Sequence, residues 1–383
     1  MRLSALHTFA SDPLLATPAI ADDQRSHPVV AAILGRRDER SLPGERRDGR
    51  RIALVIEGGG MRGVVSAGMA AAIEQLGLRD AFDEVHGASA GAFNATFLLA
   101  RQASYLTALY QHGFGDPAFV SVRSAIRGGP LFDLDYVIGE VWRTQRPLCV
   151  ERITSSGIHL HCTATDVEHA AIADLTDLRD DAEIRCALRA SARLPWLAGP
   201  PVSFRGRRWL DATIAEAIPV HVALTTATDL LVLQTRPHGV GHTPLPGLVG
   251  RLTERYVKRI NPALVELVHT RSERYDELSD RVAALASDTS QTPAVCVIRP
   301  PAGVTADWPD GEPSQHARDR RQRRLAYSLE RSDRRGSRAA WRADRPAASE
   351  GRCARAAERV RVASHEGRLA ARSNLSRKYR ETM

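Results

Sequence analysis

The chain has 383 residues, enough for one large domain or two ordinary ones, and its formal net charge is +8. From Arg318 onward, 20 Lys and Arg face 8 Asp and Glu, a net charge of +12, whereas the remainder has a net charge of −4. Because the basic excess belongs to the tail, we expect no nucleic-acid partner for the body of the protein. The sequence lacks both a membrane-spanning apolar run and a secretory signal, so we expect a cytoplasmic protein whose membrane contact is at most peripheral.

The first half of the chain shows an alternation of short apolar runs and helical spacing. Residues 52–56 are continuously apolar and end in glycines, which is typical of a strand buried on both faces. A helix is predicted over 62–76, a second strand over 82–86 and an Ala-rich helix over 90–100. This β-α-β-α order indicates a parallel sheet covered by helices on its faces.

The pattern continues through the second half. The predicted elements are a strand over 157–165, a strand over 170–175, a helix over 181–191, a hairpin over 202–210, strands over 229–234 and 294–298, and a helical region over 248–285. Together they predict a three-layer α/β/α domain with a mostly parallel central sheet.

A glycine-rich loop follows the first strand and opens the first helix. It consists of Gly58, Gly59, Gly60, Met61, Arg62 and Gly63. The N–H groups of a first helical turn and the helix dipole favour negative charge, so this loop is a predicted anion site. The spacing also fits a dinucleotide-binding loop, but the acidic residue expected about 20 residues further on is missing. A P-loop is disfavoured because no G-K-[ST] follows.

The segment Gly87-Ala88-Ser89-Ala90-Gly91 lies where the second strand meets the next helix. In this context a G-x-S-x-G segment predicts a nucleophilic serine on a strained bend, with Gly87 and Gly91 allowing close backbone approach. The N–H after Ser89 can join the anion site of the glycine loop. An alternative role for Ser89 is that of a helix N-cap. Together the two motifs predict a serine hydrolase.

A serine nucleophile needs a base, usually a histidine held by a carboxylate. None of the thirteen histidines has a strong local signature, and His159 with His161 look like one solvent-facing stripe. The other candidate is Asp211, which follows a predicted strand end and could accept a proton there, although aspartate at such a position is also a common turn-former. The residues alone leave the base open.

The chain resembles the patatin-like phospholipases, lipid acyl hydrolases that use a Ser-Asp dyad. The resemblance covers about residues 52–235 and rests on an ordered set of segments: Gly58–Gly63, Gly87–Ala92, Ala187–Ala192 with Pro195, and Trp209-Leu210-Asp211 with Ile218-Pro219-Val220. It implies Ser89 as nucleophile, Asp211 as its base and the backbone N–H groups of the glycine loop as oxyanion hole. It also implies a lipid ester substrate, a loop held by Arg62, and neither a metal nor a cofactor.

Two departures from the family pattern affect these expectations. The family's D-G-[GA] is Asp211-Ala212-Thr213 here, and because alanine lacks the freedom of glycine at positive φ, we expect Asp211 to be slightly displaced. Glu57 stands where aspartate is common. Two alternatives therefore stay open: a His-dependent serine esterase, and a non-catalytic or weakly active lipid-binding relative.

These patterns divide the chain into three regions. We interpret residues 1–50, which are polar with a short helix predicted over 27–34, as an N-terminal leader or docking arm outside the core. Residues 51–305 are the predicted acyl hydrolase domain. Residues 306–383 form an Arg-rich tail with few large aliphatic residues, which we expect to be disordered or helical and outside the core. Contact with an anionic membrane is an alternative role for this tail.

Overall fold

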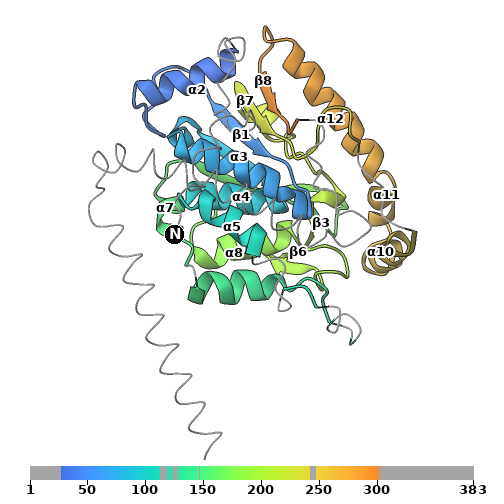
Figure 1. Cartoon of the computed structure of the whole chain (residues 1–383). Helices are drawn as coiled ribbons and strands as arrows, with labels where there is room; N and C mark the ends of the chain where they lie inside the picture. The colour runs from blue at the N-terminus through green and yellow to red at the C-terminus, as the bar shows by residue number, and fades with distance from the viewer. Residues whose placement is uncertain are drawn as a thin grey trace, which may run out of the picture.

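The structure is a computed structural model of the full chain (Figure 1). It describes residues 27–112, 119–121, 124, 127, 129–145, 147–241 and 247–301. The first half of the expected N-terminal arm and the Arg-rich tail therefore lie outside the described residues. Among the helices that are described, none combines the length and the apolar character needed to cross a bilayer.

The described strands form one mixed sheet. They are β1 (Ile52–Ile56), β2 (Glu84–Ala88), β3 (His159–Asp166), β4 (Ala171–Leu175), β5 (Val202–Phe204), β6 (Arg207–Leu210), β7 (Asp229–Leu233) and β8 (Ala294–Ile298). Their order is β5-β6-β3-β2-β1-β7-β8, and β4 pairs with β3. The five neighbouring strands β3, β2, β1, β7 and β8 pair in parallel, whereas β4, β5 and β6 pair antiparallel. The predicted mostly parallel α/β sheet is thus confirmed.

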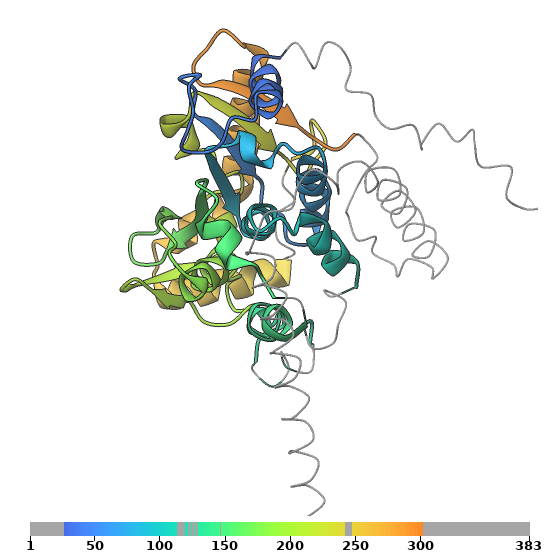
Figure 2. The same cartoon turned by 90° about the vertical axis from the view of Figure 1, so that its left-hand side faces the viewer.

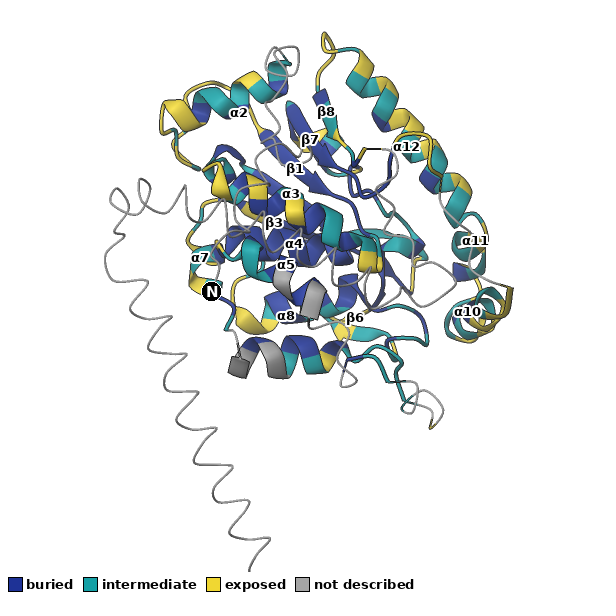
Figure 3. Cartoon of the chain, in the orientation of Figure 1, coloured by how far each residue is buried: buried dark blue, intermediate teal, exposed yellow. Residues whose placement is uncertain are grey.

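The helices form the two outer layers. The longer ones are α2 (Pro28–Asp38), α3 (Gly63–Gln75), α4 (Ala90–Leu99), α5 (Ala103–His112), α8 (Asp181–Ser191), α10 (Gly247–Ile260) and α12 (Arg271–Ser287), and the shorter ones are α7 (Val150–Thr154), α9 (Ala223–Thr226) and α11 (Leu264–His269). On β1, Leu54 packs with the core that contains α3 and α4, whereas Val55 points to the opposite face and packs with Tyr275 of α12. Figure 3 shows the result: the strands are buried and the outer helix faces are exposed. The sequence patterns did not predict α5, α7 or the π-helical segment at Tyr136–Gln145.

The part of the expected N-terminal arm that is described differs from the expectation, because α2 belongs to the core. Val29 and Ile33 are buried and pack with the main apolar cluster. Arg36, one turn further, is also buried and pairs with Asp48 at 2.7 Å and Asp83 at 2.8 Å. These residues share one face of the helix, which contacts β7 and β8 at one end of the molecule (Figures 1 and 2). The polar composition around this short stripe concealed it in the sequence.

Two strands meet end to end along one edge of β3. β2 runs parallel to β3 as far as Ala88, which lies opposite Thr163. β6 pairs antiparallel with the far end of the same edge, with Leu210 opposite Thr165, while β4 covers the other edge. The two strands therefore approach each other from opposite directions and stop on either side of Ala164. The residues that directly follow β2 and β6 are therefore brought close together beside β3.

Candidate active site

The residues that follow these strand ends are Ser89 and Asp211, which are 122 positions apart in the sequence. The Ser89 hydroxyl donates a hydrogen bond of 2.9 Å from Oγ to Asp211 Oδ2. Both residues are buried, with 6% of Ser89 and 0% of Asp211 exposed. The fold thus brings into direct contact the two residues for which the sequence suggests nucleophile and base.

Ser89 sits on a sharp turn with φ +50 and ψ −118, a backbone conformation that L-residues rarely adopt. The flanking glycines are needed for a different reason, which is close backbone approach. A Cβ on Gly87 would lie 2.5 Å from Ala92 Cα, and a Cβ on Gly91 would lie 2.1 Å from the Ile56 carbonyl oxygen. The turn therefore fits against β1 and α4 only with glycine at both positions, as the G-x-S-x-G interpretation requires.

Two residues to which the sequence assigned no role, Thr213 and Ser191, hold the Asp211 side chain and the Ser89 backbone. Thr213 donates to Asp211 Oδ1 twice, from its backbone N at 2.8 Å and from Oγ1 at 2.6 Å. Ser191 at the end of α8 accepts a hydrogen bond of 2.8 Å from the Ser89 backbone N. One carboxylate oxygen is thereby held by Thr213, which leaves the other directed at Ser89.

The environment of Asp211 sets its proton affinity. Burial raises the pKa of the Asp211 carboxyl, and the hydrogen bonds from Thr213 and Ser89 oppose this rise in part. The positive charge of Arg271, the first residue of α12, also favours the ionised form of Asp211. Conversely, burial lowers the pKa of Arg271, and the charge of Asp211 opposes that change. Asp211 is thus a buried carboxyl with a raised pKa, the property of a general base working nearer to neutral pH.

Ala212 does not prevent Asp211 from hydrogen-bonding to Ser89. It lies in the short 3-10 turn Ala212–Ile214, and its φ is not positive, so this position does not need glycine. The hydrogen bond between Asp211 and Ser89 is of ordinary length. The departure from D-G-[GA] is therefore compatible with an assembled dyad.

Only some backbone N–H groups of the glycine loop are available to bind an oxyanion. Three of them already donate to protein carbonyls, those of Gly58, Arg62 and Gly63. Within the described residues, three others donate to no protein acceptor, those of Gly59, Gly60 and Met61. Gly60 has φ +56, which favours glycine. Of the six loop residues predicted for the oxyanion hole, only these last three offer an uncommitted backbone donor.

A buried carboxylate anchors the base of this loop. Glu57 is fully buried and accepts hydrogen bonds from the Thr235 backbone N at 2.6 Å, from Thr235 Oγ1 at 2.9 Å and from the Tyr275 hydroxyl at 3.0 Å. Burial raises the pKa of Glu57, whereas these hydrogen bonds and the charge of Arg62 oppose the rise. Glu57 thus ties the loop to the end of β7 and to α12. The sequence showed only that a glutamate ends the first strand.

The two histidines of β3 have different environments. The solvent-facing stripe predicted for β3 is wrong for His161, which is 7% exposed and stacks on His86 with 4.1 Å between ring centroids. β3 lies inside the sheet with both faces covered, so alternation along it does not separate solvent from core. His159 is exposed. Within the described chain, no histidine hydrogen-bonds to Ser89 or Asp211.

Comparison with known proteins matches the part of the chain that contains this site. A family model described as patatin-like phospholipase matches residues 54–224, a range that contains both Ser89 and Asp211. The uncharacterized protein YjjU of Escherichia coli (strain K12) is 32% identical over 199 residues, which are 51% of this chain and 54% of that protein. The alignment thus spans about half of the relative's length. Residues 54–224 of the chain therefore match a patatin-like phospholipase domain.

Proposed function

We propose that this chain is a serine lipid acyl hydrolase, of the phospholipase A or lysophospholipase kind, that works through Ser89 and Asp211. The observation that carries the proposal is the buried hydrogen bond of 2.9 Å from Ser89 Oγ to Asp211 Oδ2. Asp211 takes the Ser89 proton as Oγ attacks the ester carbonyl, and this proton passes to the departing alcohol. Water, activated by Asp211, then cleaves the acyl-enzyme and restores Ser89.

A carboxylate base is favoured over a histidine for two reasons. Ser89 Oγ donates to Asp211, and no histidine of the described chain hydrogen-bonds to either residue. In addition, the buried Asp211 has a raised pKa, which makes its carboxylate a stronger proton acceptor than an exposed one. The dyad is therefore preferred to the His-dependent esterase.

The oxyanion that forms on the substrate needs donors aimed at it. The N–H groups of Gly59 and Gly60, with that of Ala90 at the first position of α4, are the groups we assign to this role. A donor of this kind commonly contributes about 3–4 kcal/mol to transition-state stabilisation. The dipole of α4, whose N-terminus begins directly after Ser89, acts in the same direction.

Labelling with a fluorophosphonate probe tests the nucleophile. We expect covalent labelling of the wild-type chain at Ser89, none in Ser89→Ala, and unchanged labelling in Ser203→Ala, which alters an exposed serine on β5. Mass spectrometry of the labelled peptide identifies the site. A panel of phospholipid, lysophospholipid, acylglycerol and short-chain esters then defines the substrate. A wild-type chain that is neither labelled nor hydrolytic would instead identify a non-catalytic lipid-binding relative.

A second variant tests position 212. Ala212→Gly is expected to change kcat/KM for ester hydrolysis by no more than about threefold, that is, under ~1 kcal/mol in activation free energy. The reason is that Ala212 has a negative φ and Asp211 is already in hydrogen-bond contact with Ser89. The fold should lose about 0.5–1 kcal/mol of stability, since glycine makes the unfolded chain more flexible. A large gain in kcat/KM would show that Ala212 does hold Asp211 out of place.

A further inference from the structure

A second cluster of ionisable residues lies on the strands beside the dyad. Glu84 and His86 belong to β2, and His161 lies opposite His86 in the parallel register with β3. Side chains paired in this way share one face of the sheet, and the β1 residues beside them on this face are Ala53 and Val55. Parallel strands buried on both faces are normally apolar throughout. Glu84 pairs with Arg51 at 2.6 Å and accepts a hydrogen bond of 2.6 Å from Thr226 Oγ1, whereas the two imidazoles at this depth call for a specific reason.

The two imidazoles differ in how their nitrogens are satisfied. His86 is 1% exposed and His161 is 7% exposed, and Nε2 of His161 has no hydrogen-bond partner among the described residues, whereas Nε2 of His86 faces Glu84. His86 Nε2 lies 3.2 Å from Glu84 Oε1, within ion-pair distance. On the other ring, His161 Nδ1 lies 2.6 Å from Asp174 Oδ2. When Nδ1–H donates to this carboxylate, Nε2 of His161 presents a lone pair, which is the arrangement found in carboxylate–histidine–metal triads.

The three side chains are close enough to share an ion. Their ligand atoms all lie within 4.8 Å of one another. Two imidazole nitrogens and one carboxylate oxygen form a donor set that suits Zn²⁺ and related divalent ions. Metal–ligand distances of about 2.0–2.2 Å require the atoms to close in, and the stacked rings must tilt from the 18° between their planes.

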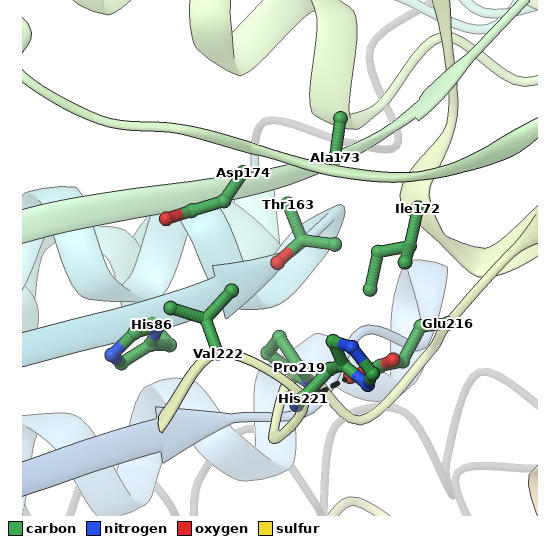
Figure 4. A pocket seen from close by; sticks show the side chains of 9 residues that line it. All are labelled: His86, Thr163, Ile172, Ala173, Asp174, Glu216, Pro219, His221 and Val222. Atoms are coloured by element: carbon green, nitrogen blue, oxygen red, sulfur yellow. Dashed lines mark hydrogen bonds between the residues drawn. The ribbon is translucent and has the colours of Figure 1, made fainter. Parts of the chain in front are cut away.

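A cavity adjoins His86 and the carboxylate partner of His161, Asp174, whereas Glu84 and His161 themselves do not line it. It has a volume of about 140 Å³, and His86 and Asp174 form part of its wall, together with Glu216 and His221 of the segment that covers the sheet (Figure 4). Neither Ser89 nor Asp211 lines it. A metal site with three protein ligands keeps an open position, and we place that position on the side of His86 that faces this cavity.

We propose that Glu84, His86 and His161 bind one divalent transition-metal ion of the Zn²⁺ class, with Asp174 orienting His161. The ion links β2 to β3 close to the turn that carries Ser89, and it takes no part in acyl transfer. This proposal is independent of the hydrolase activity. No sequence motif indicates this site, because the ligands come from two strands far apart in the chain and no Cys or His spacing marks them.

Metal titration of the purified full-length chain tests the site. After treatment with a chelator, Co²⁺ is added and its visible absorption followed, and Zn²⁺ is then used as competitor. We expect one Co²⁺ per chain, displaced by Zn²⁺, and a higher melting temperature with either ion. Asp174→Asn should weaken Co²⁺ binding by about 10–100-fold, and His161→Gln or Glu84→Gln should weaken it further.

His159→Ala is the matched control, because His159 is exposed on the same strand and should leave Co²⁺ binding unchanged. Circular dichroism shows whether each variant is folded. A wild-type chain that binds no Co²⁺ at millimolar concentration overturns the proposal, even if a variant fails to fold. Binding that survives in folded His161→Gln, or that is lost in His159→Ala, also overturns it.

Discussion

Asp211→Asn is expected to lower kcat/KM for lipid ester hydrolysis by about four orders of magnitude, ~5 kcal/mol in activation free energy. The amide has nearly the shape of the carboxyl but cannot accept the Ser89 proton, so the nucleophile is no longer activated. The fold should remain, because burial raises the pKa of Asp211 and so makes its ionised form unfavourable in the folded state. We therefore expect a melting temperature at neutral pH that equals or exceeds that of the wild type.

The pH dependence of the wild type gives a second measurement of the same role. Asp211 must be ionised to accept a proton, and its folded-state pKa is raised above 3.8. Activity is therefore present above this raised pKa and falls as the pH drops through it, so the acid limb of kcat/KM should lie above pH 3.8. Asp177→Asn, at an exposed turn, is the matched control and should leave the profile unchanged. Near-normal activity of Asp211→Asn, with loss of activity in one His→Gln variant, would favour the His-dependent esterase.

Gly91→Ala is expected to destabilise the fold by about 3 kcal/mol or more, at the upper end of the range for overpacking. The added Cβ would lie 2.1 Å from the Ile56 carbonyl oxygen and 2.8 Å from that of Glu57. Both contacts are with backbone, so no side-chain rotation relieves them and the end of β1 must shift. Since the glycine loop begins directly after Glu57, the shift also moves the oxyanion donors, and labelling of Ser89 by the fluorophosphonate should be lost.

Urea denaturation measures the free energy of unfolding for this comparison. Gly68→Ala is the matched control, because Gly68 lies within α3 and a Cβ there would meet nothing within 4 Å. Replacing this helical glycine should stabilise the fold by roughly 0.5–1 kcal/mol. A Gly91→Ala chain as stable as the wild type, with Ser89 still reactive, would contradict the close packing of the turn against β1.

Local sequence patterns predicted most of the helices and strands but not which strands lie beside one another. The helix Asp181–Ser191 and the strand Ala294–Ile298 begin and end where their apolar periodicity indicates, because that signal is local. The choice of Asp211 over a histidine could not be made from the residues, since it depends on pairing between strands far apart in the chain. Only the family resemblance suggested it.

The supporting residues could not be predicted for the same physical reason. Thr213 and Ser191 hold the dyad, and Glu57 holds the loop, through hydrogen bonds whose geometry depends on the tertiary structure. The burial of His161 depends on β3 being an inner strand, which alternation of polar and apolar residues does not reveal. The role of α2 was missed because two buried aliphatic side chains on a polar segment give too weak a signal.

The end-to-end meeting of β2 and β6 along β3 has a consequence for how this domain tolerates change in length. The gap between Ser89 and Asp211 is set by a single β3 residue, Ala164, and not by the 122 positions that separate them in the sequence. Insertions in the loops and helices between the two strands therefore leave the dyad intact. Deletion of one residue within β3 would reverse the faces of the following side chains and separate nucleophile from base.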